Sequence, residues 1–415
     1  MAERFKAPRG TFDILPEGAP VRRRIEEVSR RILEGAGYRR IEVPVFEDTD
    51  LFARGVGEST DIVQKQMFSF EDQGGRSLTL RPEATASICR AYLEHGMQKL
   101  PRPVKLWTDG PFFRHERPQA GRFRQFAQID AEAIGSDSPL VDAELILLAN
   151  DVIADLGVEE VRLRLGSLGR PATRAAYLGE LRDYLRRHEG ELSDEVRSRL
   201  DVNPLRAFDA DHPGTRKVMK GAPRLLDRLD PEDAGHFAAV RAQLDRNGIA
   251  YEIDPTLVRG LDYYTRTVFE FESERLGAQS GIGGGGRYDG LIELLGGPPT
   301  PACGWALGVD RTALALEANA GAGTEPERDG VFVVAEGDDR DSALALVTEL
   351  RRAGIRADLD LADRAVKGQM RQADRVGARH ALILGGDGKA TLRDLTSGEE
   401  REIDPAAAVE TLSSP

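Results

Sequence analysis

The sequence has few cysteines and histidines and no long hydrophobic run. Cys89 and Cys303 are its only cysteines and are far apart, which excludes a CxxC zinc or redox pair. The six histidines are scattered and show no metal-ligand spacing. No window approaches the roughly 18 apolar residues of a membrane span, and the first residues show no apolar stretch typical of a signal peptide. We therefore expect a cytoplasmic protein with no metal site and no membrane contact.

Two common nucleotide-binding signatures and the usual nucleophile patterns are also missing. There is no GxxxxGK[ST], which excludes a P-loop. Segment 280–291 spells GxGxxG at Gly281, Gly283 and Gly286, but RYDG follows where an apolar helix should begin. This favours a backbone turn against a substrate, or close packing of strands, over a Rossmann site. No GxSxG elbow or Cys/His nucleophile pattern appears.

Length and composition are those of an ordinary globular protein. The chain has 415 residues, of which 40% are apolar and 31% charged, enough for about two to four domains. Its formal net charge of −13 argues, taken alone, against a nucleic-acid partner. Locally the sign reverses, because residues 102–124 carry +4 and residues 363–379 carry +3. Local charge is the better indicator of a polyanionic partner.

Hydrophobic periodicity predicts the elements of the first 300 residues. An amphipathic helix is expected over 21–38, followed by a strand over 38–46, and Ser138 is expected to cap an apolar helix that extends to about residue 156. Further strands are expected at 104–107 and 126–134. The stretch 170–236 is charged and helical in pattern, which indicates an inserted helical unit. Residues 250–310 return to strands, with eleven glycines between 277 and 308.

The composition of residues 319–330, NAGAGTEPERDG, is that of a linker. After it, strands and helices alternate in the βαβ manner, with a second helix expected at 363–377, which predicts a separate α/β domain of roughly 85 residues. We place the domain boundaries at 1–322, a linker at 323–329 and the last domain at 330–415. In this last domain, Arg364, Lys367, Arg371, Arg375 and Arg379 follow helical spacing. They predict either a surface that contacts a polyanion or a solvated helix face.

Segment FFRHERPQAGRFRQF (112–126) reads as two strands joined by a loop. On such a strand, Arg114 can direct its planar guanidinium at a phosphate, and Phe126 can stack on a flat ring. A solvated basic hairpin is the alternative interpretation.

Two further segments place an arginine on a defined element. In TLVRGLDYYTRTVFEF (256–271), Arg259 and two tyrosines lie beside an apolar strand, where one of Tyr263 and Tyr264 would face the core. In GWALGVDRTALAL (304–316), Arg311 begins a helix, a position that suits a phosphate. Surface arginines are the alternative in both segments. With no nucleophile found, Arg114, Arg259 and Arg311 favour displacement at phosphorus, which needs positioning and positive charge.

Segment LRPEATASICRAY (80–92) is expected to begin a helix at Pro82. Glu83 would then lie in the first turn, where a carboxylate interacts favourably with the helix dipole. Binding of a substrate ammonium group by Glu83 is the second interpretation.

Together these segments resemble the histidyl-tRNA synthetases, a class II aminoacyl-tRNA synthetase family. The resemblance covers nearly the whole chain, and LVRGLDYYTRTVFE and GGGRYDGL are its most specific parts. Ala84, Gln66 and Asp310 stand where the family more often has glycine, glutamate and glutamate. The resemblance implies an α+β fold, in which helices flank an antiparallel sheet, with a helical insertion, an α/β anticodon-binding domain and a homodimeric assembly.

The resemblance also implies a two-step reaction and a set of site residues. L-Histidine would react with ATP, accompanied by Mg²⁺, and the histidyl group would pass to tRNA-His. Arg259, Arg114 and Arg311 would be catalytic. ATP would contact Arg114, Glu116, Phe126 and Arg311. Histidine would contact Glu83, Thr85, Gln128, Glu132, Arg259, Tyr263, Tyr264 and Tyr288. The tRNA would contact Arg117, Gln119, Arg122, Arg364, Lys367 and Arg371.

Two other functions fit parts of the sequence. Some synthetase-like proteins are non-catalytic regulatory subunits of ATP phosphoribosyltransferase, but these generally lack the last domain and the intact motifs found here. A structural RNA-binding protein would leave the combination of Arg259 and Glu83 unexplained.

Overall fold

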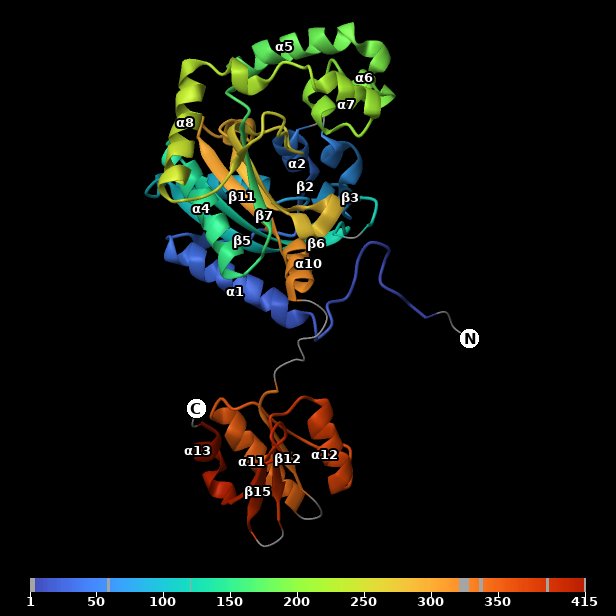
Figure 1. The fold of residues 1–415 in the computed structure, drawn as a ribbon, viewed down its shortest axis with the longest axis vertical. Coiled ribbons are helices and arrows are strands. Elements are labelled where there is room, and N and C mark those ends of the chain that lie inside the picture. Colours follow the sequence, from blue (N-terminus) through green and yellow to red (C-terminus); the bar gives the residue numbers. More distant parts are fainter. Residues whose placement is uncertain are drawn as a thin grey trace. The chain divides into compact units, whose positions relative to one another are not determined.

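The computed structural model of the chain describes residues 4–57, 60–119, 121–320, 328–335, 339–385 and 388–413. The chain divides into two units, Met1–Gly321 and Ala322–Pro415, both drawn in Figure 1. Residues 323–327 of the expected linker lie outside the described residues. No helix in the described ranges is long and apolar enough to cross a bilayer.

An eight-stranded sheet forms the centre of the first unit, in the order β1-β5-β6-β11-β10-β9-β7-β8. The six inner strands, from β5 to β7, are antiparallel to one another, and only the edge strands β1 and β8 pair in parallel, with β5 and β7. This arrangement confirms the α+β class. The strands are β1 (Arg39–Arg40), β5 (Val104–Phe113), β6 (Gln125–Ile134), β7 (Val161–Ser167), β8 (Glu252–Ile253), β9 (Thr265–Ser273), β10 (Gly281–Arg287) and β11 (Ala302–Gly308).

Helices cover one face of this sheet. α1 (Ala19–Gly35), α4 (Pro139–Asp155), α8 (Pro231–Arg246) and α10 (Val309–Ala320) contribute apolar side chains to one core, which includes Ile25, Ile146 and Phe237 beside Trp305 of the sheet. The expected helix after Ser138 is confirmed, because the Ser138 hydroxyl accepts from the backbone N–H of Leu140 at 3.3 Å. The other face carries α3 (Thr85–Glu94) and α9 (Leu291–Leu294) over a second core.

The strand expected over 38–46 is wrong in its middle. Only β1 and β2 (Phe46–Asp48) are paired, and β2 belongs to a small sheet with β3 (Phe68–Glu71) and β4 (Ser77–Leu80). Pro44 lacks an N–H for a continuous ladder. The carbonyls of Val43 and Val45 instead accept from the side chain and the backbone N–H of Arg81, at 3.0 and 2.9 Å. α2 (Thr49–Val56) follows this segment.

The stretch 170–236 is helical in the structure. It contains α5 (Pro171–Arg187), α6 (Asp194–Arg199), α7 (Pro213–Met219) and the start of α8, at the top of Figure 1. Their buried side chains, among them Tyr177, Leu181 and Val218, belong to the same core as α3. Short helical turns join these helices, and one of them, Pro204–Asp209, brings Asp209 to the cavity described below.

The second unit is a five-stranded sheet in the order β13-β12-β14-β15-β16, flanked by helices. Alternate residues of β12 enter two cores: Val331 and Val333 pack on the side of α11, and Phe332 and Val334 on the side of α12. The elements are β12 (Val331–Val334), α11 (Asp339–Arg352), β13 (Ala357–Leu359), α12 (Val366–Arg375), β14 (His380–Leu384), β15 (Ala390–Asp394), β16 (Glu400–Ile403) and α13 (Ala408–Ser413).

The helix expected at 363–377 is shorter in the structure. The Asp360 carboxylate accepts from the backbone N–H of Arg364 at 2.8 Å and pairs with its side chain, which holds this arginine in a turn before α12. At the other end, Gly377 has φ +68, so the chain leaves the helix before Arg379. Of the five basic residues expected on one helix face, only Lys367, Arg371 and Arg375 lie on α12.

Candidate active site

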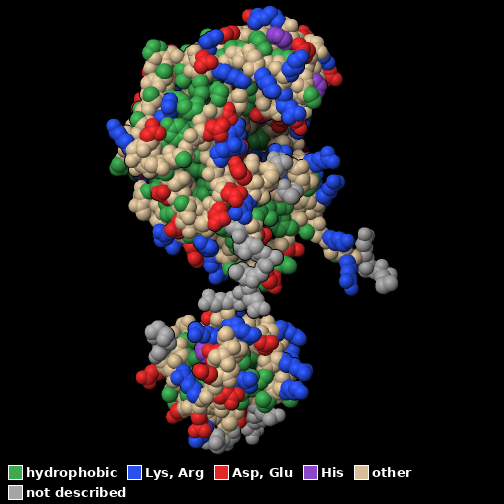
Figure 2. All heavy atoms as spheres, viewed as in Figure 1, with side chains coloured by type: hydrophobic (Ala, Val, Ile, Leu, Met, Phe, Trp, Pro, Cys, Tyr) green, Lys and Arg blue, Asp and Glu red, His purple; other side chains and the backbone are tan. Residues whose placement is uncertain are grey.

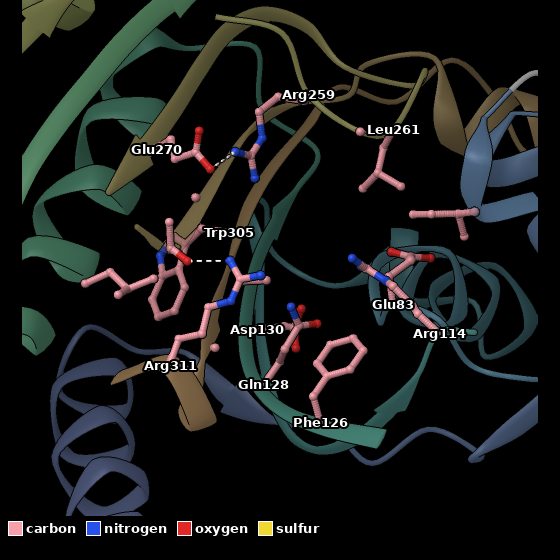
Figure 3. A pocket seen from close by; sticks show the side chains of 18 of the residues that line it. Glu83, Arg114, Phe126, Gln128, Asp130, Arg259, Leu261, Glu270, Trp305 and Arg311 are labelled. Carbon is pink, nitrogen blue, oxygen red and sulfur yellow. Dashed lines mark hydrogen bonds and ion pairs between the residues drawn. The ribbon is translucent and has the colours of Figure 1, made fainter. Parts of the chain in front are cut away.

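A cavity of about 440 Å³ opens over the face of the large sheet opposite α1 and α4. Asp130, Glu270 and Asp209 line it although sequence reasoning did not select them. Among the described residues no group of three or more His, Cys, Asp or Glu could hold a metal ion. Figure 3 shows the cavity with ten of its side chains labelled. The expected site residues in its lining are Glu83, Thr85, Arg114, Glu116, Arg122, Phe126, Gln128, Arg259, Tyr263, Tyr264, Tyr288 and Arg311.

The remaining expected residues lie outside the lining. Glu132 is 1% exposed and lies behind Thr85 and Tyr288. Arg117 and Gln119 belong to the loop between β5 and β6, where Gln119 and Arg122 form an isolated bridge. The three basic residues expected to contact tRNA in the last domain, Arg364, Lys367 and Arg371, belong to the second unit.

The floor of the cavity is built from strand alternation and small residues. Gln128, Asp130 and Glu132 of β6 share one face of the sheet, and in register with them β11 places Gly308, Ala306 and Gly304. A Cβ on Gly304 would lie 1.6 Å from Glu132 Oε2, so a larger residue there would displace this carboxyl group. The adjacent GIGGGG segment is strand β10 in this floor, which rules out a Rossmann turn and confirms close strand packing.

Arg114 follows directly after β5 and lies over Phe126 at the end of β6. Its Nε donates to the carbonyl of Pro82 at 2.9 Å, and the guanidinium carbon is 5.2 Å from the centroid of the Phe126 ring. The backbone N–H of Arg114 donates to the carbonyl of Arg124 at 3.0 Å, which closes the hairpin beneath it. The expected pair of strands joined by a loop is confirmed, and its arginine and aromatic ring face the cavity.

Arg311 lies in the first turn of α10 and joins two glycine-containing segments. Its Nε donates to the carbonyl of Gly121 at 2.8 Å, and Nη1 donates to the carbonyl of Gly281 at 2.7 Å. Burial, together with the like charges of Arg122 and Arg114, lowers the pKa of Arg311 from its ordinary value. The neighbouring Asp310 carboxylate accepts from the backbone N–H of Ala127 at 2.7 Å, which ties the start of α10 to β6.

Arg259 extends over the floor from the loop before β9. Its Nη1 lies 3.0 Å from Glu270 Oε1, the contact drawn as a dashed line in Figure 3. Burial acts to lower the pKa of Arg259, but the Glu270 carboxylate outweighs it and raises that pKa above its ordinary value. Glu270 was missed because an acidic residue within an apolar strand gives no sign of its partner.

Glu83 receives two backbone donors at the start of α3. Its Oε2 accepts from the N–H of Thr85 at 2.7 Å and its Oε1 from the N–H of Ala86 at 2.9 Å. The helix begins at Thr85 rather than at Pro82, because this carboxylate caps it from outside the first turn. Burial raises the pKa of Glu83, although both amides and Arg114 act against the shift.

Glu132 and three tyrosines form the deepest part of the site. Thr85 Oγ1 donates to Glu132 Oε1 at 2.6 Å, and the Tyr288 hydroxyl donates to Oε2. Burial raises the pKa of Glu132 to about 8. Tyr263 and Tyr264 both belong to the second core and both also line the cavity. They share this position because β9 begins only at Thr265, so strand alternation does not place them on opposite faces.

Family models match almost the whole chain. The model described as Histidyl-tRNA synthetase matches residues 10–312, and the model described as Anticodon binding domain matches residues 330–414. The chain is 46% identical to a histidine–tRNA ligase of Nocardia farcinica, over 99% of this chain and 98% of the relative. It is 48% identical to that of Halorhodospira halophila, over 95% and 94%.

Solved structures show the same similarity. The apo histidyl-tRNA synthetase of S. aureus superposes with a TM-score of 0.83 at 38% identity, and the match covers 98% of this chain and 99% of that one. A Bacillus halodurans protein described as an ATP phosphoribosyltransferase regulatory subunit/histidyl-tRNA synthetase gives a TM-score of 0.67 at 23% identity, over 92% of this chain and 99% of that one. This second likeness concerns the fold alone.

Proposed function

The chain belongs to the histidyl-tRNA synthetase family, and we propose that its cavity activates L-histidine with ATP and transfers the histidyl group to tRNA-His. The observation that carries this proposal is the separation of charge along one sheet face. Arginines surround Phe126 at one end of β6, and carboxyl groups surround Tyr288 at the other. ATP is anionic and flat at its base, whereas histidine presents an ammonium group and an imidazole, so the two ends match the two substrates.

In the first step a carboxylate oxygen of histidine attacks the α-phosphorus of ATP, and pyrophosphate leaves. In this proposal Phe126 stacks on adenine with Glu116 beside it, Arg114 binds the α-phosphate and Arg311 the γ-phosphate. Arg259 lies between the two ends and stabilises the negative charge that develops on the α-phosphate and the carboxylate. Arg114 and Arg311 are held by neutral carbonyls, so their charge is available to the phosphates.

In the second step a hydroxyl of the 3′-terminal ribose of tRNA attacks the histidyl carbonyl carbon, and AMP leaves. Glu83 and Thr85 bind the α-amino group and Gln128 lies by the carboxylate. Glu132 and Tyr288, with Tyr263 and Tyr264 alongside, bind the imidazole. Leaving one ring nitrogen of histidine without a partner would cost about 1–3 kcal/mol, which gives this end its power to reject amino acids of similar shape.

Mg²⁺ belongs to the proposal as a companion of ATP. In nucleotide sites this ion is held mainly by substrate phosphates, with one or two protein carboxylates. Glu116 and Glu270 both line the cavity near Arg311, which fits such a partial ligand set. When bound there, Mg²⁺ would neutralise charge on the β- and γ-phosphates.

We assign the tRNA to two basic surfaces. Arg117, Gln119 and Arg122 occupy the loop at the cavity, where the acceptor end must enter. In the second unit, Arg364, Lys367 and Arg371 are exposed, and Figure 2 shows basic side chains gathered along the edge formed by α12 in Figure 1. Reversing Lys367 and Arg371 to glutamate should raise the tRNA KM several-fold and reduce its salt dependence. Unchanged values would remove α12 from the tRNA surface.

We also propose a homodimer located in the cytoplasm, where tRNA and ATP are available. Val45, Phe46 and Phe70 are exposed on or beside the small sheet, at 39%, 51% and 44%, and Phe12 and Ile14 are exposed at 42% and 50%. The ring centroids of Phe46 and Phe70 are 6.2 Å apart, and neighbouring exposed apolar side chains mark interaction surfaces. Light scattering of the wild type should give twice the mass of one chain. The double variant Phe46→Glu/Phe70→Glu should give a mass closer to that of the monomer. A wild-type monomer would contradict the proposal.

The direct test of the function is ATP–pyrophosphate exchange with purified wild-type protein. We expect exchange with L-histidine and much slower exchange with other amino acids, followed by histidine esterification of tRNA-His. Absence of histidine-dependent exchange would contradict the proposal. The regulatory-subunit alternative predicts that outcome.

A further inference from the structure

Asp130 is a buried carboxyl group in the floor of the cavity, and the structure gives it no hydrogen-bond or ion-pair partner among the described residues. It is 2% exposed and lines the cavity. It makes no hydrogen bond or ion pair with any described residue, and its Oδ2 is buried. Burying a carboxyl group without a partner is costly. A group in this state at a ligand site therefore points to a partner that arrives with the ligand.

The two neighbouring carboxyl groups differ from Asp130 because their oxygens have donors. Both oxygens of Glu83 accept from backbone amides at the start of α3. Both oxygens of Glu132 accept from hydroxyls, those of Thr85 and Tyr288. Among the described acidic residues at this end of the cavity, Asp130 is thus the one with accepting capacity that the protein leaves unused.

The nearest cations do not neutralise Asp130. Arg81 and Arg114 act electrostatically on it, but neither forms an ion pair with it. Arg81 donates its Nε to Pro111 and its Nη1 to Val43, at 2.9 and 3.0 Å, and Arg114 donates to Pro82. These arginines are therefore held by the backbone and leave the carboxyl group facing the cavity.

A second buried polar atom lies beside Asp130. Thr108 of β5 is in register with Asp130 on the adjacent strand, so both side chains stand on the same face of the sheet. Thr108 is 1% exposed, and within the described part of the chain its hydroxyl oxygen also has no hydrogen-bond partner. On the opposite side of Asp130, β11 places Ala306, whose small side chain leaves room above the floor.

The position of Asp130 along β6 identifies the group it would meet. Alternate residues of the strand run from Phe126 through Gln128 and Asp130 to Glu132, with steps of about 6.6 Å. In the proposed function, adenine lies at Phe126 and imidazole at Glu132. The part of histidine between its carboxylate and its ring is the α-carbon with its ammonium group. Figure 3 shows Asp130 next to Gln128 on this strand.

We propose that Asp130 binds the α-ammonium group of histidine, together with Glu83. This inference rests on the proposed function. Burial, and after it the carboxyl groups of Glu132 and Glu83, raise the pKa of Asp130 well above its ordinary value. An ammonium group at this position supplies the positive charge that favours the ionised carboxylate, so binding and ionisation of Asp130 support each other.

The test compares ligands that differ in the ammonium group. L-Histidinol retains it, whereas 3-(imidazol-4-yl)propionate lacks it, and both are measured as inhibitors of histidine-dependent exchange or by calorimetry. We expect Asp130→Asn to weaken the binding of L-histidine and L-histidinol by roughly 10- to 100-fold, which is the loss expected when a charge-assisted contact is removed. Binding of the propionate should change by less than about twofold, because it has no group for Asp130.

The control variant is Asp151→Asn, at an exposed position on α4. Its affinity for each of the three ligands should equal that of the wild type. Asp130→Ser serves as a second variant, with thermal unfolding measured for both. If Asp130→Asn weakens all three ligands equally, or none, the assignment is wrong, while wild-type exchange still supports the proposed function. If wild type itself shows no histidine-dependent exchange, the proposed function fails and this inference fails with it.

Discussion

The two ends of the cavity have charged side chains of opposite sign, but these side chains are held in the same way, by neutral hydrogen-bond partners. At the end where we place the phosphates of ATP, called the phosphate end here, Arg114 and Arg311 are held by the carbonyls of Pro82, Gly121 and Gly281. At the histidine end, Glu83 and Glu132 are held by amide and hydroxyl donors. Neutral partners fix a charged group without cancelling its charge. In the proposed function, the charge of Arg114 and Arg311 is therefore left for the phosphates, although Glu116 and Glu270 also line that part of the cavity. The carboxyl groups at the other end are left for the cationic part of histidine.

Holding charged side chains by neutral partners in a buried site disfavours their charged forms at both ends. Burial and the neighbouring Arg122 and Arg114 lower the pKa of Arg311, and burial raises the pKa of Glu132 to about 8. Both shifts act against the charged form of the group. The two ends differ in their protonation. Arginine stays charged despite its lowered pKa, whereas carboxyl groups with raised pKa values take up protons. The histidine end should therefore be the pH-sensitive one.

Arg259 lies between the ends and is paired with Glu270, so its removal should have the largest effect. We expect Arg259→Ala to reduce kcat/KM for histidine-dependent exchange by about 10²–10⁴-fold, because in the proposed function Arg259 stabilises charge on both the carboxylate and the α-phosphate. The assay is initial-rate pyrophosphate exchange at saturating ATP. Arg30→Ala, in an exposed pair with Glu34 on α1, should be unaffected, and full exchange by Arg259→Ala would remove Arg259 from the mechanism.

A methyl group added at the histidine end should disturb that end first. The Cβ of Gly304→Ala would lie 1.6 Å from Glu132 Oε2, so Glu132 must move from Thr85 and Tyr288. We expect the histidine KM to rise roughly tenfold or more and the free energy of unfolding to fall by about 1–3 kcal/mol. Kinetics and urea unfolding check both. Gly35→Ala, with no atom within 4 Å of the new Cβ, is the control: its histidine KM should not rise and its free energy of unfolding should not fall. An unchanged histidine KM in Gly304→Ala would show that Gly304 does not position Glu132.

The pH dependence of stability should report on Glu132. Its pKa is 4.5 when unfolded and about 8 when folded, so between these values the folded chain holds a proton that the unfolded chain has released. The resulting stabilisation is complete below pH 4.5 and is lost as the pH rises toward 8, by up to about 1.4 kcal/mol per pH unit. Denaturant unfolding at several pH values should show a flatter profile for Glu132→Gln. Parallel profiles for the two proteins would show that Glu132 ionises normally.

Much of the phosphate end could be predicted from the sequence, because its arginines lie on elements that local patterns reveal. The hairpin around Arg114 and the strand and helix around Arg311 are both where periodicity places them. The α+β class was likewise predictable. The register that brings Gly304 under Glu132 depends on pairing between distant strands, which no local pattern encodes.

The histidine end was harder to predict for the same reason. Asp130 at this end and Glu270 beside Arg259 are acidic residues in buried strands, and only the assembled sheet shows that they face a cavity. The expected strand through Pro44 and the helix start at Pro82 were wrong because the Arg81 and Glu83 side chains replace backbone contacts there. Side-chain hydrogen bonds that replace backbone hydrogen bonds in this way depend on tertiary contacts, which local sequence patterns do not reveal.

The most direct test of charge separation is a crossed measurement of two Michaelis constants in two variants. In pyrophosphate exchange, Arg311→Gln should raise the ATP KM by roughly 10- to 100-fold and leave the histidine KM within about twofold, whereas Glu83→Gln should do the reverse. Thermal unfolding confirms that both variants are folded. If both constants rise together in both variants, the cavity does not have two ends of opposite charge that act on separate substrates.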